Sequence, residues 1–157
     1  MGTLALDIAP SWDELGPVSE QALAFLREEE LSSELVDAMT MTCCELVENA
    51  VKYGSDDGSI ELRVHVEDRA VTVEVKNRVA DSNLKNLTRL DTMIQWIRGF
   101  QDPFQAYLER LKEVSVQSLT TEESGLGLVR IAYEGRAILD FFLDENHTLN
   151  ISAVRQR

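Results

Sequence analysis

The 157-residue sequence predicts an α+β fold, a two-layer sandwich whose mixed, mostly antiparallel sheet of four to five strands carries its helices on one face. Two patterns predict this class. Apolar residues recur at steps of three and four from Leu35 to Ala50, which indicates an amphipathic helix. Apolar and polar residues alternate from Ile60 to Val75, which indicates half-buried strands. The length suits one domain, so we expect a single unit over residues 1–157.

The first expected elements are a short strand and a helix. Alternation over residues 4–8 predicts the strand. Ser11 followed by Glu14 has the spacing of a capping box. It predicts a helix that ends near Glu28.

A longer helix and a hairpin follow. Ser32 or Ser33 would cap the helix, which ends at Tyr53, and Gly54 stands where a left-handed terminal residue is common. Asp56-Asp57-Gly58 predicts a turn. The chain then predicts an antiparallel hairpin whose strands cover residues 60–66 and 71–75.

The second half begins with a helical insertion over about residues 82–118. Its pattern runs from Asp81 to about Glu113, and Gly99 and Pro103 divide it into two helices. Polar residues without periodicity then predict a mobile loop at Thr120 to Ser124. The remaining elements are a helix that starts near residue 124 and closing strands near residues 136–143 and 147–154.

Composition restricts the classes of partner. The formal net charge of −13 argues against binding nucleic acid or an anionic membrane, because phosphates would be repelled. It does not exclude ATP, whose charge a metal ion and helix N-termini can meet locally. No apolar run approaches the roughly 20 residues of a membrane span, and no signal peptide begins the chain. We therefore expect a cytoplasmic protein.

Glu45, Asn49 and Lys52 form a polar row on the long predicted helix. Their spacings of four and three residues make the side chains neighbours on one stripe. Asparagine is a weak helix former with no cap to make here, and its neutral oxygen suits a Mg²⁺ ion that already carries a triphosphate. Glu45 could accept a proton from water or a hydroxyl. The alternative is a solvated face on which Glu48 and Lys52 form an ordinary i, i+4 pair.

Gly125-x-Gly127 is the second motif of chemical interest. Glycines before a helix let backbone N–H groups approach phosphate oxygens, with the helix dipole assisting. The alternative is that the two glycines serve packing. Their position downstream of the asparagine helix and a hairpin favours the phosphate interpretation.

Together the motifs resemble those of the GHKL ATP-binding family of type II topoisomerases, Hsp90 chaperones, histidine kinases and mismatch-repair ATPases. Glu45-x-x-x-Asn49-Ala50-x-Lys52-Tyr53 resembles its N box, and Ser124-Gly125-Leu126-Gly127-Leu128 resembles its second glycine box. The element order is similar to that of the anti-sigma-factor serine kinases. The resemblance implies ATP and Mg²⁺ as cofactors, with Asn49 binding the metal and Glu45 as general base. It implies further nucleotide contacts from the remaining motif residues, Lys52, Tyr53, Gly125, Leu126, Gly127 and Leu128.

The first glycine box of that family, Asp-x-Gly-x-Gly, is absent. The chain has Asn77-Arg78-Val79-Ala80-Asp81 at the expected place. Asn77 would accept the amino hydrogen of adenine more weakly than a carboxylate does, and Val79 would crowd the ring. This asparagine and the helical stretch before Gly-Leu-Gly-Leu are similar to the SiaB-like stand-alone bacterial protein kinases. That likeness implies phosphorylation of a single-domain protein partner on Ser or Thr.

Two functions are therefore expected from the sequence. The first is a regulatory ATP-binding protein of the Ser/Thr kinase kind, whose partner is an antagonist-type or sigma-factor-like protein. The alternative is a degenerate, non-catalytic interaction module that binds a regulatory partner without nucleotide. A homodimer is one option for its assembly. An open space between the Asn49 helix and Asn77 would favour the kinase, and Val79 or the helix at Leu84 filling it would favour the module.

Aromatic residues gather in the insertion. Most of them are assigned to the core, but exposure of Trp96 and Phe100 would instead mark a partner surface. The residues are Trp96, Phe100, Phe104 and Tyr107.

Overall fold

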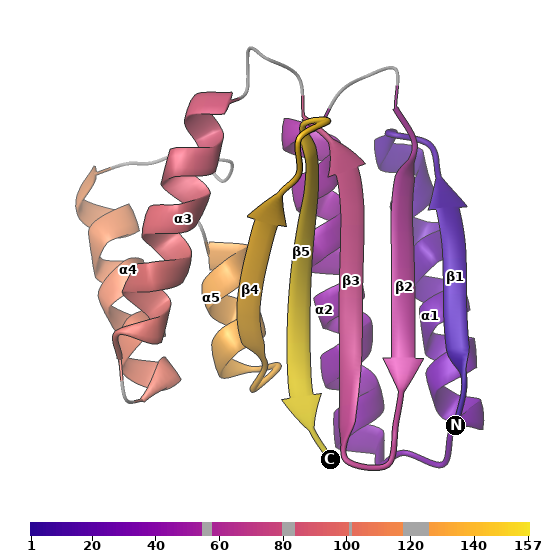
Figure 1. Ribbon diagram of the computed structural model, residues 1–157. Coiled ribbons are helices and arrows are strands. Elements are labelled where there is room, and N and C mark those ends of the chain that lie inside the picture. Colours follow the sequence, from indigo (N-terminus) through magenta and orange to yellow (C-terminus); the bar gives the residue numbers. More distant parts are fainter. Residues whose placement is uncertain (55–57, 80–83, 101, 118–125) are drawn as a thin grey trace.

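The computed structural model describes residues 1–54, 58–79, 84–100, 102–117 and 126–157 (Figure 1). The elements are β1 (Thr3–Ile8), η1 (Trp12–Glu14), α1 (Leu15–Glu28), α2 (Ser33–Tyr53), β2 (Ile60–Val66), β3 (Ala70–Arg78), α3 (Leu84–Arg98), α4 (Pro103–Gln117), α5 (Leu126–Tyr133), β4 (Ile138–Leu143) and β5 (Thr148–Gln156).

The sheet confirms the predicted α+β class. Its described strands lie in the order β1-β2-β3-β5-β4, and each neighbouring pair is antiparallel. The predicted hairpin is β2–β3, in which Val64 pairs with Val73. Because side chains alternate between the two faces of a strand, this register places the valines of both strands on one buried face.

Helices α1 and α2 lie side by side behind the sheet, and α5 lies behind β4 (Figure 1). Helices α3 and α4, the predicted insertion, stand beside the β4 edge of the sheet instead of beneath its centre. Helix α3 packs mainly against α4, α5 and β4, and α4 packs against α5. The insertion is therefore joined to the rest of the molecule largely through α5.

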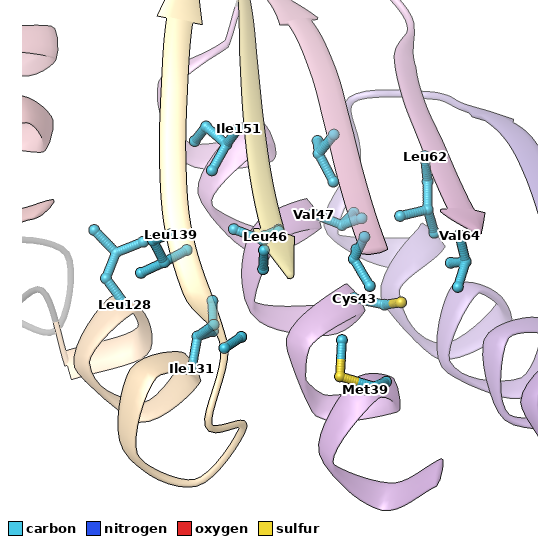
Figure 2. Close-up of a cluster of buried hydrophobic side chains, with 14 of the residues drawn as sticks. Met39, Cys43, Leu46, Val47, Leu62, Val64, Leu128, Ile131, Leu139 and Ile151 are labelled. Atoms are coloured by element: carbon cyan, nitrogen blue, oxygen red, sulfur yellow. The ribbon is translucent and has the colours of Figure 1, made fainter. Parts of the chain in front are cut away.

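The hydrophobic core fills the space between the sheet and its helices (Figure 2). Leu46 and Val47 of α2 are fully buried, as are Leu62 and Val64 of β2. Ile131 brings α5 into the same cluster. Burial of large aliphatic side chains contributes roughly 1.5–3 kcal/mol each, which fixes the distance between α2, α5 and the strands.

The ends of α1 and α2 follow local capping chemistry. The side chain of Ser11 accepts a hydrogen bond from the Asp13 amide and begins the turn η1, which leads into α1. Ser32 is the N-cap of α2, and its hydroxyl oxygen accepts from the Leu35 amide at 3.2 Å. Of the two serines that the sequence allowed, Ser32 is thus the cap.

The prediction of a left-handed Gly54 is wrong. Its φ of −79° and ψ of 174° are extended, so any residue could adopt this backbone. Glycine is needed for a different reason. A Cβ here would lie 2.8 Å from Nδ2 of Asn77 and would press on the carbonyl oxygen of Ala50.

Trp96, Phe100 and Tyr107 follow the core assignment, whereas Phe104 is 38% exposed and does not. Trp96 and Phe100 are partly buried, pack against the core and contact each other edge to face at 4.7 Å between ring centroids. Phe104 and Tyr107 both lie against Tyr133 of α5. The expected turn at Asp56-Asp57 and the expected loop at Thr120 to Ser124 lie outside the described residues. Within the described ranges, no helix combines the length and the apolar content needed to cross a bilayer.

Candidate functional site

The polar row of α2 lies in the second half of the helix. Glu45, Asn49 and Lys52 are all partly buried. The Lys52 ammonium lies 3.6 Å from Oε1 of Glu48, so the ordinary helix pair that the sequence allowed is formed. No hydrogen bond or ion pair within the described ranges engages the Asn49 carboxamide. Its oxygen is therefore available to a ligand.

Glu45 meets the first turns of α5, where the second glycine motif ends. A Cβ at Gly127 would collide with Oε2 of Glu45, so only glycine permits this approach without rearrangement. The other oxygen, Oε1, accepts from Nη1 of Arg130 at 3.2 Å. Nε of the same guanidinium donates to Oε2 of Glu134 at 2.6 Å. The fold thus joins two motifs that lie some eighty residues apart in the sequence.

The surroundings of Glu45 act on the pKa of its carboxyl in opposite directions. Burial raises the pKa of its carboxyl, and the neighbouring Glu48 carboxylate raises it further. Arg130 and Lys52 lower the same pKa, but the net direction is upward. A carboxylate with a raised pKa has an increased affinity for a proton, which is the property required of a general base.

Asn77 is buried at the end of β3, where it pairs with Ile60 of β2 and Leu149 of β5. Its Nδ2 makes a long hydrogen bond of 3.4 Å to the carbonyl oxygen of Arg78. Within the described residues, its Oδ1 accepts no hydrogen bond. This orientation leaves an acceptor free, as recognition of an amino group requires.

Val79 occupies the place of the first expected glycine. It is 3% exposed, forms an antiparallel bridge with Gly54, and donates its amide hydrogen to the carbonyl oxygen of His147 at 2.9 Å. Val79 therefore joins the end of β3 to the residue that follows α2. The helix that begins at Leu84 lies at the other side of α5 and does not pack mainly on α2 (Figure 1).

The other predicted site residues differ in their burial. Tyr53 is the half-buried last residue of α2, and Leu126 is the half-buried first residue of α5. Leu128 is 5% exposed and belongs to the core, where Figure 2 places it against β4. Gly125 lies outside the described residues. The structure also adds Arg130, which the motif comparison missed, although its position three residues after Gly127 places it close to that glycine on the helix surface.

The donor set can be tested against Mg-ATP. In the described part of the chain, no group of three or more His, Cys, Asp or Glu side chains could hold a metal ion by itself. An ion at Asn49 would therefore depend on triphosphate oxygens, which suits Mg²⁺ because it is usually held by few protein ligands together with substrate phosphates. Within the described residues, the amide of Asn49 and Oδ1 of Asn77 have no protein partner, so both oxygens are available as acceptors.

Comparisons with known proteins identify the family of the chain and a similar fold. Residues 8–133 match the family model described as the histidine kinase-like ATPase domain. No curated protein matches the sequence significantly. Among solved structures, a chain of the SiaB–SiaC complex from Pseudomonas aeruginosa is similar, with a TM-score of 0.68 and 17% sequence identity. The match covers 98% of this chain and 89% of that chain, and at this identity the likeness is one of fold. Because the family model covers well over half of the sequence, the chain belongs to the family of histidine kinase-like ATPase domains.

Proposed function

We propose that this protein is a regulatory ATP-binding protein that transfers phosphate from Mg-ATP to a Ser or Thr hydroxyl of a protein partner. The observation that carries the proposal is the contact between Glu45 and Gly127. It brings the proposed base of α2 against the glycine turn proposed to hold phosphate.

Each residue of the site then has a defined task. Asn49 would ligate Mg²⁺, which neutralises charge on the phosphates. Backbone N–H groups near Gly125 and Gly127 would stabilise charge on the transferred group. Lys52 would contact phosphate after exchanging its partner Glu48 for the ligand. Asn77 would accept the amino hydrogen of adenine through its free Oδ1.

Glu45 performs the proton transfer in this scheme. It takes the proton of the partner hydroxyl while the hydroxyl oxygen forms its bond to the γ-phosphorus. The bond from the γ-phosphorus to the bridging oxygen breaks, and its electron pair leaves with ADP. The raised pKa of the Glu45 carboxyl favours acceptance of this proton.

The partner is proposed to be a small regulatory protein of the antagonist or sigma-factor type. The similar solved structure is that of a complex between two named proteins, SiaB and SiaC, which supports a protein as the partner. The formal net charge of −13 disfavours nucleic acid and anionic membranes.

Calorimetric titration with Mg-ATP tests the proposal. Wild-type protein should bind, and Asn49→Ala should lose at least about tenfold in affinity, because a metal ligand is removed. Thr88→Ala is a control at an exposed position of α3, in the insertion, and should leave binding unchanged. Absence of binding by the wild-type protein at millimolar Mg-ATP would contradict the proposal.

A second function is favoured by Val79. Val79 is buried and bridges Gly54, at a position where the resemblance expects a glycine without a side chain. The protein would then be a docking module that holds its partner without nucleotide. The same titration separates the two: Val79→Gly should create or improve nucleotide binding if the side chain excludes adenine. A wild-type protein that binds ATP tightly contradicts the docking-only function.

A further inference from the structure

The guanidinium of Arg130 is shared between two carboxylates of different elements. Nη1 donates to Oε1 of Glu45 at 3.2 Å, across the interface between α5 and α2. Nε donates to Oε2 of Glu134 at 2.6 Å, one turn along α5. The contact with Glu134 restricts the long arginine side chain, so the second contact needs little further ordering.

Both carboxylate oxygens of Glu45 contact residues of α5. Arg130 engages Oε1, and the Cα side of Gly127 lies against Oε2. The side chain of Glu45 is 18% exposed, so water replaces these contacts only in part. The orientation of the carboxylate is therefore set by the helix that directly follows the glycine motif.

Other charges near Glu45 do not supply the same support. Glu48 repels the carboxylate, and Lys52 is engaged by Glu48 at 3.6 Å. The charged or titratable groups around Glu45 are Cys44, Glu48 and Lys52 on α2 and Arg130 and Glu134 on α5. Within the described residues, Arg130 is the cation that hydrogen-bonds to Glu45.

We propose that Arg130 is a positioning residue for Glu45, whose carboxylate it holds aimed at the position of the attacking oxygen. The inference rests on the proposed function, because it needs Glu45 to act as a base. Arg130 reaches the reaction only through Glu45. Its loss should therefore reduce the rate of the chemical step and leave nucleotide affinity intact.

The test uses Mg-ATP hydrolysis in single-turnover conditions, with water as the acceptor. Glu45 takes a proton of water as the water oxygen bonds to the γ-phosphorus and ADP departs. Arg130→Gln should slow this step by about ten- to a hundredfold, since misplacement of a reacting group by about 1 Å costs that much. The calorimetric Kd for Mg-ATP should stay within about twofold. Arg130→Lys keeps the charge and should recover most of the rate.

The matched control is Arg98→Gln in α3. Arg98 has nearly the same side-chain exposure as Arg130, 48% against 47%, and lies 3.9 Å from Asp140. This variant removes the same charge and should hydrolyse ATP at the wild-type rate. Melting temperatures of all variants verify that they are folded.

A double-mutant comparison identifies the route of the effect. If Arg130 acts only through Glu45, then Arg130→Gln costs nothing further in a Glu45→Gln background. Multiplying losses in the double variant would overturn the inference, as would an unchanged rate in Arg130→Gln. Failure of Arg130→Lys to exceed Arg130→Gln would do the same.

A separate measurement distinguishes failure of the proposed function from failure of the positioning role. If the wild-type protein binds no Mg-ATP, the proposed function is wrong. If it binds Mg-ATP without hydrolysing it, hydrolysis does not report on Glu45. In either case the carboxyl ¹³C resonance of Glu45 in the free protein becomes the readout for the role of Arg130. A changed resonance in Arg130→Gln but not in Arg98→Gln supports the positioning role. An unchanged resonance overturns it.

Discussion

At the scale of single residues, Glu45 is subject to opposed electrostatic influences. Burial and Glu48 raise the pKa of its carboxyl, and Arg130 and Lys52 lower it, with a net rise. The native state therefore binds this proton more tightly than the unfolded chain does. Stability from this group is complete below the ordinary glutamate pKa and is lost as the pH rises through the raised value.

Glu45→Gln should consequently change the pH dependence of stability. The variant cannot ionise at this position, so its melting temperature relative to wild type should be higher at about pH 7.5 than at about pH 4. Circular dichroism melts at both pH values measure the difference. An equal difference at the two pH values would show that the Glu45 carboxyl is not perturbed.

Gly127 is the residue that allows the carboxylate to approach α5. Gly127→Ala places a Cβ against Oε2 of Glu45, so the carboxylate must move aside. This cost should cancel part of the gain of about 1 kcal/mol that alanine brings inside a helix, and the variant should be stabilised less than Gly16→Ala. Gly16→Ala is the matched control, because no atom lies within 4 Å of its added Cβ. It should be neutral or stabilising by up to about 1 kcal/mol. Chemical denaturation measures both, and equal effects would contradict the close contact.

At the scale of elements, α2 carries both the core and the proposed site. Its buried face includes Met39, Cys43 and Leu46, and its remaining stripe carries Glu45 and Asn49. Because a helix is rigid, packing of the apolar face fixes the angular position of the polar row. The start of the helix should therefore matter for the stability of the whole protein.

Removal of the cap on α2 tests this directly. Ser32→Ala loses the hydrogen bond to the Leu35 amide and should cost about 1 kcal/mol of unfolding free energy. Ser33→Ala changes the neighbouring residue inside the helix and should be neutral or slightly stabilising, because alanine is the better helix former. Denaturant midpoints of the two variants decide the matter. A larger loss in Ser33→Ala would contradict the assigned cap.

Helix α5 is held from two sides. Glu45 of α2 contacts it through Gly127 and Arg130, and α4 contacts it through the aromatic pair of Phe104 and Tyr133, whose centroids are 5.0 Å apart. Displacement of α4 would therefore act on the helix that orients Glu45. This arrangement makes the insertion a neighbour of the proposed site, although α3 and α4 stand outside the main sandwich.

At the scale of the whole molecule, the net charge of −13 opposes compaction. Raising NaCl from about 0.02 M to about 0.3 M shortens the screening length and should raise the melting temperature. Differential scanning calorimetry measures the change. A fall on addition of salt would mean that local pairs such as Arg155 with Glu34 outweigh the overall repulsion.

Much of the fold was predictable because it depends on local periodicity. Alternation predicted the β2–β3 hairpin, and the three-to-four spacing predicted α2 with its buried face. The role of Gly54 was not predictable from the sequence. Glycine is needed there because a Cβ would press on Asn77, and it is the pairing of the strands that places Asn77 next to Gly54. The role of Arg130 was also not predictable, because its partner Glu45 lies on another helix and is far away in the sequence.

The sequence by itself determined the elements, their order and the row of Glu45, Asn49 and Lys52, because these follow from spacing along one helix. Tertiary structure alone decided that Glu45 lies against Gly127 and Arg130, that Val79 is buried under the end of α2, and that the insertion stands beside β4. Such contacts join residues far apart in the chain. Their geometry depends on how the helices pack on the sheet, and no spacing within one element contains that information.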